Sequence, residues 1–178
     1  MSNNKLYNSI EIPGSFLIPG FSIYVLEIIK EKNKWFYIGM TGDPYYPSAR
    51  SAFHRLSGHL ELNTRSTQNQ LLIALNQKLN INSVEDLKKL DIRMHHFPIE
   101  GFRRITDKKL DNVTMQKLQQ TEEYKDYKIK QKKVAVLENA LIYKLDDKLL
   151  NKTIGKIIEE DKIDFPEVYN RILKLVNS

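Results

Sequence analysis

The sequence predicts an α+β fold in which helices flank a small central sheet of three antiparallel or mixed strands. Two short runs near the N-terminus are rich in β-branched and aromatic residues and enclose a polar turn. Several later stretches repeat apolar residues at helical spacing. The length of 178 residues suits one domain with its own core, and there is no internal repeat or low-complexity linker. We therefore assign residues 1–178 to a single domain.

The first elements expected are an irregular lead-in and a β-hairpin. Residues 1–20 contain two prolines and two glycines in their second half, which disfavour regular structure. Residues 21–29 and 34–40 are predicted to be strands joined by the polar turn 31–33. Each strand carries one tyrosine at a similar place, in Ser22-Ile23-Tyr24 and in Tyr37-Ile38-Gly39. The pattern therefore predicts two phenol groups side by side on one hairpin.

The remaining elements are mostly helices, and their ends carry capping and breaking residues. Pro47 and Pro166 suit the first turn of a helix, and Ser83 followed by Asp86 resembles a capping arrangement. Pro98 and Gly101 are expected to end the third strand. The expected order is a helix over 48–60, a helix over 67–79, a short helix from 83, a strand over 90–99, a helical stretch with a break over 113–149, and a helix over 165–176.

Arg55 and His59 form a pair on the first predicted helix. The apolar residues of that helix make one stripe, and these two residues fall together at its margin, whereas His54 points toward solvent. An exposed helical pair is the ordinary interpretation of such spacing. A cationic group and a proton-carrying group at the edge of a core face would also be well placed to border a cleft.

Glu138 is unusual because it lies within the apolar stripe of its helix. A carboxylate is seldom buried without a partner, because its desolvation costs several kcal/mol or more. One explanation is a buried Arg or Lys that pairs with it. A bound cation is the other, since magnesium takes hard oxygen ligands and commonly only one or two carboxylates.

The ordered set Tyr24, Tyr37-Ile38-Gly39, Arg55, His59, Glu138 and Asn151 resembles the GIY-YIG nuclease family. The spacing of Arg55 and His59 is similar to that in members that are bacterial restriction endonucleases. Two positions depart from the family pattern: Ser22 stands where glycine is usual, and Met40 stands where several members carry lysine. The stretch 61–133 is longer than the minimal family core, and we expect it to be an insert.

The resemblance implies a role for each matching residue. Tyr24 would be the general base, Tyr37 would hydrogen-bond the nucleophile or the phosphate, and Arg55 would clamp the phosphate. His59 would receive the proton from Tyr24, or Arg55 would stabilise the phenolate; either would lower the barrier. Glu138 would hold one Mg²⁺ (or Mn²⁺), and Asn151 would orient that site by hydrogen bonding, although an asparagine after a helix is usually a cap or turn residue.

The basic residues are concentrated upstream of Glu138. The formal net charge is +6, and residues 101–133 hold ten Lys or Arg against five Asp or Glu. A lysine-rich helix is most often a solvated face, but next to a nuclease site it would contact phosphates. We predict that five lysines, interleaved with Tyr124 and Tyr127, bind DNA: Lys125, Lys128, Lys130, Lys132 and Lys133.

Composition narrows the cellular setting. The chain has no cysteine, which excludes disulfides and thiolate metal sites and fits a reducing cytoplasm. We see neither a signal-peptide pattern nor an apolar run of membrane-spanning length. We expect a cytoplasmic protein without a membrane partner.

The functional hypothesis is a metal-dependent DNA endonuclease of the restriction or defence type, acting on double-stranded DNA. A homodimer would match the symmetry of a palindromic site. Two alternatives stay open: a nicking or repair nuclease, and a catalytically inactive nucleic-acid-binding module of the same fold, which the missing lysine at Met40 would favour.

Overall fold

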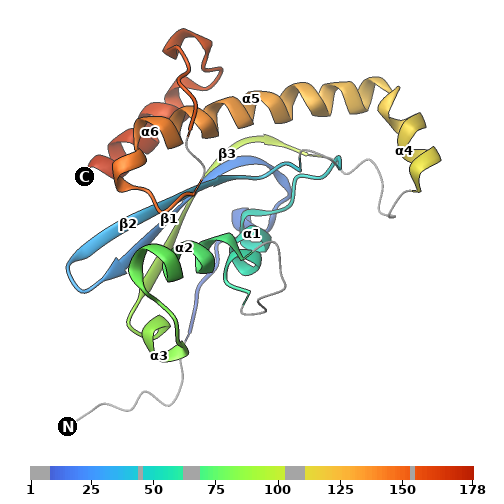
Figure 1. The fold of residues 1–178 in the computed structure, drawn as a ribbon. Coiled ribbons are helices and arrows are strands. Elements are labelled where there is room, and N and C mark those ends of the chain that lie inside the picture. Colours follow the sequence, from blue (N-terminus) through green and yellow to red (C-terminus); the bar gives the residue numbers. More distant parts are fainter. Residues whose placement is uncertain (1–8, 44–45, 62–68, 103–110, 153–154) are drawn as a thin grey trace.

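The computed structural model describes residues 9–43, 46–61, 69–102, 111–152 and 155–178. A three-stranded antiparallel sheet lies between two layers of helices (Figure 1). The strands are β1 (Gly20–Lys30), β2 (Asn33–Met40) and β3 (Asp91–Gly101), in the spatial order β2-β1-β3. The predicted α+β class and the three-stranded sheet are confirmed.

The central strand β1 is buried on both faces because helices cover both. One layer contains α5 (Glu122–Lys144) and α6 (Pro166–Asn177), and the other contains α1 (Ala52–His59) and α2 (Gln70–Leu79) (Figure 1). Side chains of β1 alternate between the layers. Ile23 and Val25 pack in the cluster of α5 and α6, and Tyr24, Leu26 and Ile28 pack in the cluster of α2. Each fully buried aliphatic side chain contributes roughly 1.5–3 kcal/mol.

The stretch 61–133 supplies α2, the short α3 (Val84–Leu87), β3 and α4 (Asn112–Gln119). Helix α2 and strand β3 are part of the core of the fold. Leu71 and Leu75 of α2 pack beneath the sheet, and β3 pairs with β1 along its length. The predicted cap of α3 is confirmed, because the Ser83 hydroxyl accepts a hydrogen bond from the Asp86 amide at 3.1 Å. The predicted start of the second helix, at residue 67, lies outside the described residues.

The helix predicted over 48–60 begins later, at Ala52. Ser51 is its N-cap and accepts a hydrogen bond from the His54 amide at 3.2 Å. The preceding loop is held instead by Tyr127 of α5, whose hydroxyl donates to the Asp43 carbonyl at 2.6 Å. Tyr127 is therefore a buried anchor and not part of an exposed basic surface.

The helical stretch predicted over 113–149 contains the expected break and ends earlier than expected. Thr121 separates α4 from α5 by accepting the Tyr124 amide at 3.2 Å. Helix α5 ends at Lys144, and a 3-10 turn, η2 (Asp146–Lys148), follows. The chain then runs along the free edge of β2, where the Leu150 amide donates to the Phe36 carbonyl at 2.7 Å.

Two smaller differences concern prolines and the lead-in. A 3-10 turn, η1 (Gly14–Leu17), follows Pro13 where irregular structure was expected. Strand β3 continues through Pro98 to Gly101, which is tolerated because β3 is an edge strand and its pairing with β1 is irregular at that point. A further 3-10 turn, η3 (Glu160–Lys162), precedes α6. None of the helices within the described ranges combines the length and the apolar character that a bilayer crossing requires.

Candidate functional site

Tyr24 lies in the middle of β1 with its side chain 1% exposed. The register of the hairpin places it opposite Gly39 of β2. A Cβ atom at position 39 would overlap the Tyr24 hydroxyl oxygen and the ring carbon that bears it. The glycine of Tyr37-Ile38-Gly39 therefore provides the space that the Tyr24 ring occupies.

Tyr37 lies on the same face of the hairpin as Tyr24, as the sequence predicts. It pairs with Leu26, two residues along β1 from Tyr24, and side chains two residues apart on a strand share a face. The ring of His59 contacts both phenols, with centroid distances of 4.9 Å to Tyr37 and 5.6 Å to Tyr24. The two phenols and the imidazole form one aromatic cluster between β1, β2 and α1.

A short hydrogen bond joins His59 to Tyr24. The Nε2 atom of His59 lies 2.7 Å from the Tyr24 hydroxyl oxygen, and the imidazole is 5% exposed. The other ring nitrogen, Nδ1, is buried without a hydrogen-bond partner among the described residues. The phenol is thus the polar group that orients this imidazole.

Burial keeps both members of this pair neutral near pH 7. Desolvation, helped by the positive charge of Arg55, lowers the pKa of His59 from 6.5 to about 4. Desolvation also raises the pKa of Tyr24 to about 12, although the charge and a hydrogen bond of Arg55 oppose that rise. The pKa of Tyr37 is raised as well, first by burial and then by the neighbouring Tyr24.

Arg55 lies on α1 one turn before His59, so the two residues share a side of the helix as predicted. It lines a small pocket of about 40 Å³ together with Gly42, Asp43, Ser48 and Arg50. Its Nε atom is buried and has no hydrogen-bond partner among the described residues. Its guanidinium group therefore has a donor left for an incoming acceptor.

Glu138 comes from α5 in the other layer and meets this cluster at the end of β2. The residue as a whole is half-buried, but its carboxylate is desolvated and accepts a hydrogen bond from the Met40 amide. Burial raises its pKa from 4.5 to about 7, and the charge of Arg55 acts in the opposite direction. Within the described residues Glu138 makes no direct ion pair with Lys or Arg, but Arg55 lies close enough for its charge to act on the carboxylate.

A divalent cation fits this environment. The carboxylate is desolvated and keeps capacity to accept, and a hard cation would relieve the cost that raises its pKa. No group of three or more His, Asp and Glu side chains gathers in a ligand-like cluster within the part of the chain that the structure describes. Glu138 would then be a single protein carboxylate whose metal shell is completed by water and phosphate oxygens, a common arrangement for Mg²⁺.

Asn151 reaches β2 from its outer edge. Its Oδ1 atom accepts the Ile38 amide at 2.9 Å, and its Nδ2 atom donates to the Ile38 carbonyl at 2.7 Å. The side chain thus acts on the backbone between Tyr37 and Gly39, and its hydrogen bonds go to the strand and not to Glu138. The sequence interpretation missed Lys78, whose ammonium group donates to the Leu149 and Asn151 carbonyls at 2.9 and 3.1 Å and fixes this segment.

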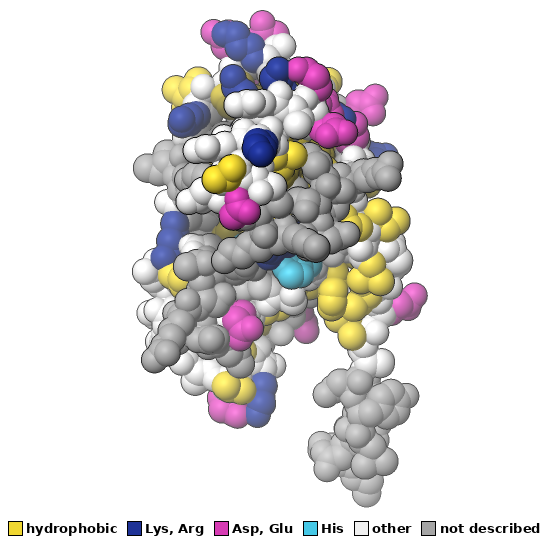
Figure 2. Space-filling view, turned by 90° about the vertical axis from the view of Figure 1, so that its right-hand side faces the viewer, with side chains coloured by type: hydrophobic (Ala, Val, Ile, Leu, Met, Phe, Trp, Pro, Cys, Tyr) yellow, Lys and Arg dark blue, Asp and Glu magenta, His cyan; other side chains and the backbone are white. Residues whose placement is uncertain are grey.

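The five lysines predicted to bind DNA lie around α5 and not along one stripe. At 100° per residue, Lys125, Lys128 and Lys132 share one side, and Lys130 and Lys133 share another. Ion pairs within the described residues include those of Lys125 with Glu122, of Lys130 with Glu100 and Asp126, and of Lys133 with Asp164. Basic and acidic side chains are interspersed on the face that contains α4 and the start of α5 (Figure 2). A role of these lysines in DNA binding remains a prediction.

The site therefore brings together Tyr24, Tyr37, Arg55, His59 and Glu138, from both helical layers and two strands. No protein-family model, no curated protein and no solved structure matches this chain.

Proposed function

We propose that this protein is a metal-dependent endonuclease that hydrolyses phosphodiester bonds in DNA with a site of the GIY-YIG type. One observation carries the proposal: three groups from two separate helices, α1 and α5, act on a single phenol of β1. His59 Nε2 lies 2.7 Å from the Tyr24 hydroxyl, and the charges of Arg55 and Glu138 both act on the pKa of Tyr24. Convergence of titratable groups with shifted pKa values is typical of general acid–base sites.

The hydrogen bond between Tyr24 and His59 suggests a route for the proton. Tyr24 takes a proton from the attacking water while its own proton passes to His59 Nε2. The hydroxide forms the new P–O bond as the scissile P–O bond breaks, and the displaced oxygen leaves as an alkoxide. The pKa of about 4 makes the imidazolium unfavourable in the free protein. A phosphate anion held beside Arg55 would offset the guanidinium charge that depresses this pKa, so substrate binding would favour the transfer.

Arg55 and Tyr37 would hold the phosphate. The guanidinium group has an unused donor in a buried setting, and a guanidinium fork suits two non-bridging phosphate oxygens. Tyr37 keeps a protonated phenol, because its pKa is raised, and it can donate a hydrogen bond to the nucleophile or to the phosphate. Mg²⁺ or Mn²⁺ bound at Glu138 would polarise the phosphate and stabilise the leaving oxyanion.

The same proposal includes a substrate, a cellular setting and a role for the lysines of α5. The substrate would be double-stranded DNA, the setting a cytoplasmic restriction or defence system, and the lysines of α5 would contribute phosphate contacts. Asn151 would act through the strand it holds, by fixing the backbone that carries Tyr37 and Gly39.

Incubation of supercoiled plasmid with the protein tests the proposal. We expect cleavage in Mg²⁺ or Mn²⁺ that a chelator abolishes. Glu138→Gln should lose at least about a hundredfold in rate, whereas Glu167→Gln, a matched change of an exposed glutamate on α6, should cut like the parent. A parent protein that is inert with either metal, or a Glu138→Gln variant that cuts at the parental rate, would contradict the proposal.

An inactive DNA-binding module of the same fold is the second candidate, and Met40 favours it. The Met40 side chain is 7% exposed and packs in the core, so this position offers no positive charge to a phosphate. The plasmid experiment separates the two, because the module would bind DNA and leave it intact. Accumulation of nicked circles would instead indicate a nicking or repair enzyme.

A further inference from the structure

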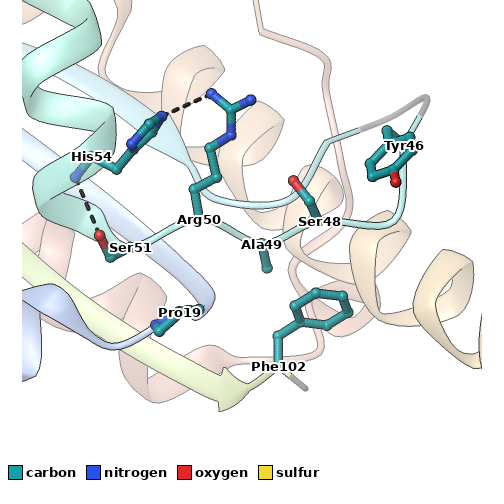
Figure 3. Close-up of a pocket in the computed structure, with 8 residues that line it drawn as sticks. All are labelled: Pro19, Tyr46, Ser48, Ala49, Arg50, Ser51, His54 and Phe102. Atoms are coloured by element: carbon teal, nitrogen blue, oxygen red, sulfur yellow. Dashed lines mark hydrogen bonds between the residues drawn. The ribbon is translucent and has the colours of Figure 1, made fainter. Parts of the chain in front are cut away.

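A surface pocket of about 500 Å³ opens next to the candidate site, on the loop that leads into α1. Its volume falls in the range of small-ligand sites. Three segments form it, and its lining residues are drawn in Figure 3: Pro19, Tyr46, Ser48, Ala49, Arg50, Ser51, His54 and Phe102.

The lining combines aromatic surface with a cationic end. Phe102 is held edge-on against Phe21 and Tyr127, with centroid distances of 5.8 and 5.4 Å, so its orientation is fixed before any ligand arrives. Arg50 lies 2.8 Å from His54 Nε2, and this pair sits at one end of the segment 46–51 with the Tyr46 ring at the other (Figure 3). A nucleotide has both matching features, a flat base and an anionic phosphate.

The pocket adjoins the part of the candidate site that contains Arg55. The small cavity that Arg55 lines shares Ser48 and Arg50 with the larger pocket. Arg55 in turn acts on the Tyr24 phenol. A phosphate at Arg55 would therefore place the adjoining nucleotide of the same strand at the pocket.

We infer that this pocket takes one unpaired nucleotide next to the phosphodiester that is cut. Its base lies against Tyr46 and Phe102, and its phosphate contacts Arg50. This inference rests on the proposed nuclease function and adds a substrate preference to it. A base can enter such a pocket only after it leaves the duplex stack, which costs a few kcal/mol in paired DNA and little in single strands, mismatches or opened ends.

Fluorescence anisotropy with a labelled oligothymidylate of about ten nucleotides tests the inference. Arg50→Ala and Tyr46→Ala should each weaken binding about tenfold, in line with one lost phosphate contact or one lost stacking platform. Arg50→Lys and Tyr46→Phe should restore most of the affinity. Arg171→Ala, a matched change of an exposed arginine on α6, should bind within about twofold of the parent.

The salt dependence separates the two contacts. Arg50→Ala should reduce the slope of log Kd against log salt by about 0.7, the value for one phosphate on a single strand, whereas Tyr46→Ala should leave the slope unchanged. Folded variants that bind the oligonucleotide like the parent would overturn the inference, and so would a parent that cuts plasmid but does not bind single strands. In both of those cases plasmid cleavage by the parent would leave the proposed function standing. A parent that neither binds nor cuts would overturn both.

Discussion

At the residue scale, the position of the Tyr24 phenol depends on Gly39 and on His59. Gly39 leaves the space above its Cα free, and His59 holds the hydroxyl at 2.7 Å. Both contacts come from other elements than β1. The geometry of the phenol is therefore a product of packing across the hairpin and against α1.

Gly39→Ala tests this packing. The new methyl group would displace the Tyr24 ring, and we expect a loss of about 1–3 kcal/mol in stability together with a large loss of cleavage. The same change made in a Tyr24→Ala background should cost much less, because the overlapping ring is absent. Denaturant unfolding of the four proteins in this double-mutant cycle measures the coupling. Equal costs in both backgrounds would show that the ring does not lie over residue 39.

Glu138 gives a second residue-scale prediction through pH. Its folded pKa of about 7 exceeds the ordinary 4.5, so the folded protein holds this proton more tightly than the unfolded chain. Ionisation of Glu138 therefore destabilises the folded protein. This loss of stability is absent below pH 4.5 and complete above pH 7. Glu138→Gln should be as stable as the parent at pH 4.5 and more stable at pH 8, by roughly 1–3 kcal/mol, because one pKa unit corresponds to about 1.4 kcal/mol.

The quantity to measure is the difference in stability between Glu138→Gln and the parent. The titration of His59 also changes the stability with pH, in the opposite direction. Its folded pKa of about 4 lies below 6.5, so its contribution to the parent's stability rises between these pH values. That contribution is common to both proteins and cancels in the difference. Thermal unfolding across this pH range in chelator is the measurement. A variant that is less stable than the parent at pH 8 would assign Glu138 to a structural interaction instead.

At the element scale, the free edge of β2 is closed by the segment after α5. Asn151 bonds both backbone groups of Ile38, and Lys78 holds the carbonyls of Leu149 and Asn151 from α2. Strand β2 is thus fixed on one edge by β1 and on the other by a side-chain amide. This closure positions Tyr37 and Gly39, which flank Ile38.

Asn151→Ala should therefore act through β2. Two buried backbone groups would lose their partners, and we expect a loss of about 2–3 kcal/mol in unfolding free energy. Hydrogen exchange at the Ile38 amide should accelerate more than exchange in β3. Asn170→Ala, an exposed asparagine on α6, should change stability by less than about 0.5 kcal/mol. Unaltered exchange at Ile38 in the Asn151 variant would contradict this role.

Local patterns explain how much of these elements could be predicted from the sequence. The hairpin follows from alternation around a polar turn, and the stripe of Val134, Leu137 and Leu141 marks α5. The sequence predicts too early a start for α1, because Pro47 and Ser48 also favour the first turn of a helix. The start of α1 depends on a non-local contact, the hydrogen bond from Tyr127 of α5 to the loop that precedes α1.

The sequence predicts which residues of the candidate site come together better than it predicts how they are arranged. Tyr24, Tyr37, Arg55, His59 and Glu138 meet as the ordered pattern suggests. The bond of Asn151 to Ile38 spans 113 residues and has no local signal, and neither has the contact of Lys78 with the same segment. The space above Gly39 depends on strand register, which the sequence leaves open by a residue or two.

At the scale of the whole molecule, the described residues form one candidate site, and under the proposed function one such site would cut one strand. Cutting of both strands would then require either two copies about a two-fold axis or sequential rebinding of one copy. We expect a homodimer on a short duplex, measured by the size of the complex alongside a time course on plasmid. A one-to-one complex that yields only nicked circles would indicate the nicking alternative.

The central claim is that the Tyr24 phenol, paired with His59, drives hydrolysis of a phosphodiester bond. Its most direct test is the single-turnover rate of plasmid cleavage in Mg²⁺ by the parent and by Tyr24→Phe, which removes one oxygen and keeps the ring over Gly39. We predict metal-dependent cleavage by the parent and a rate about 10²–10⁴-fold lower in the variant, with similar DNA affinity and thermal stability. A parent without cleavage, or a variant within about threefold of the parental rate, would contradict the claim.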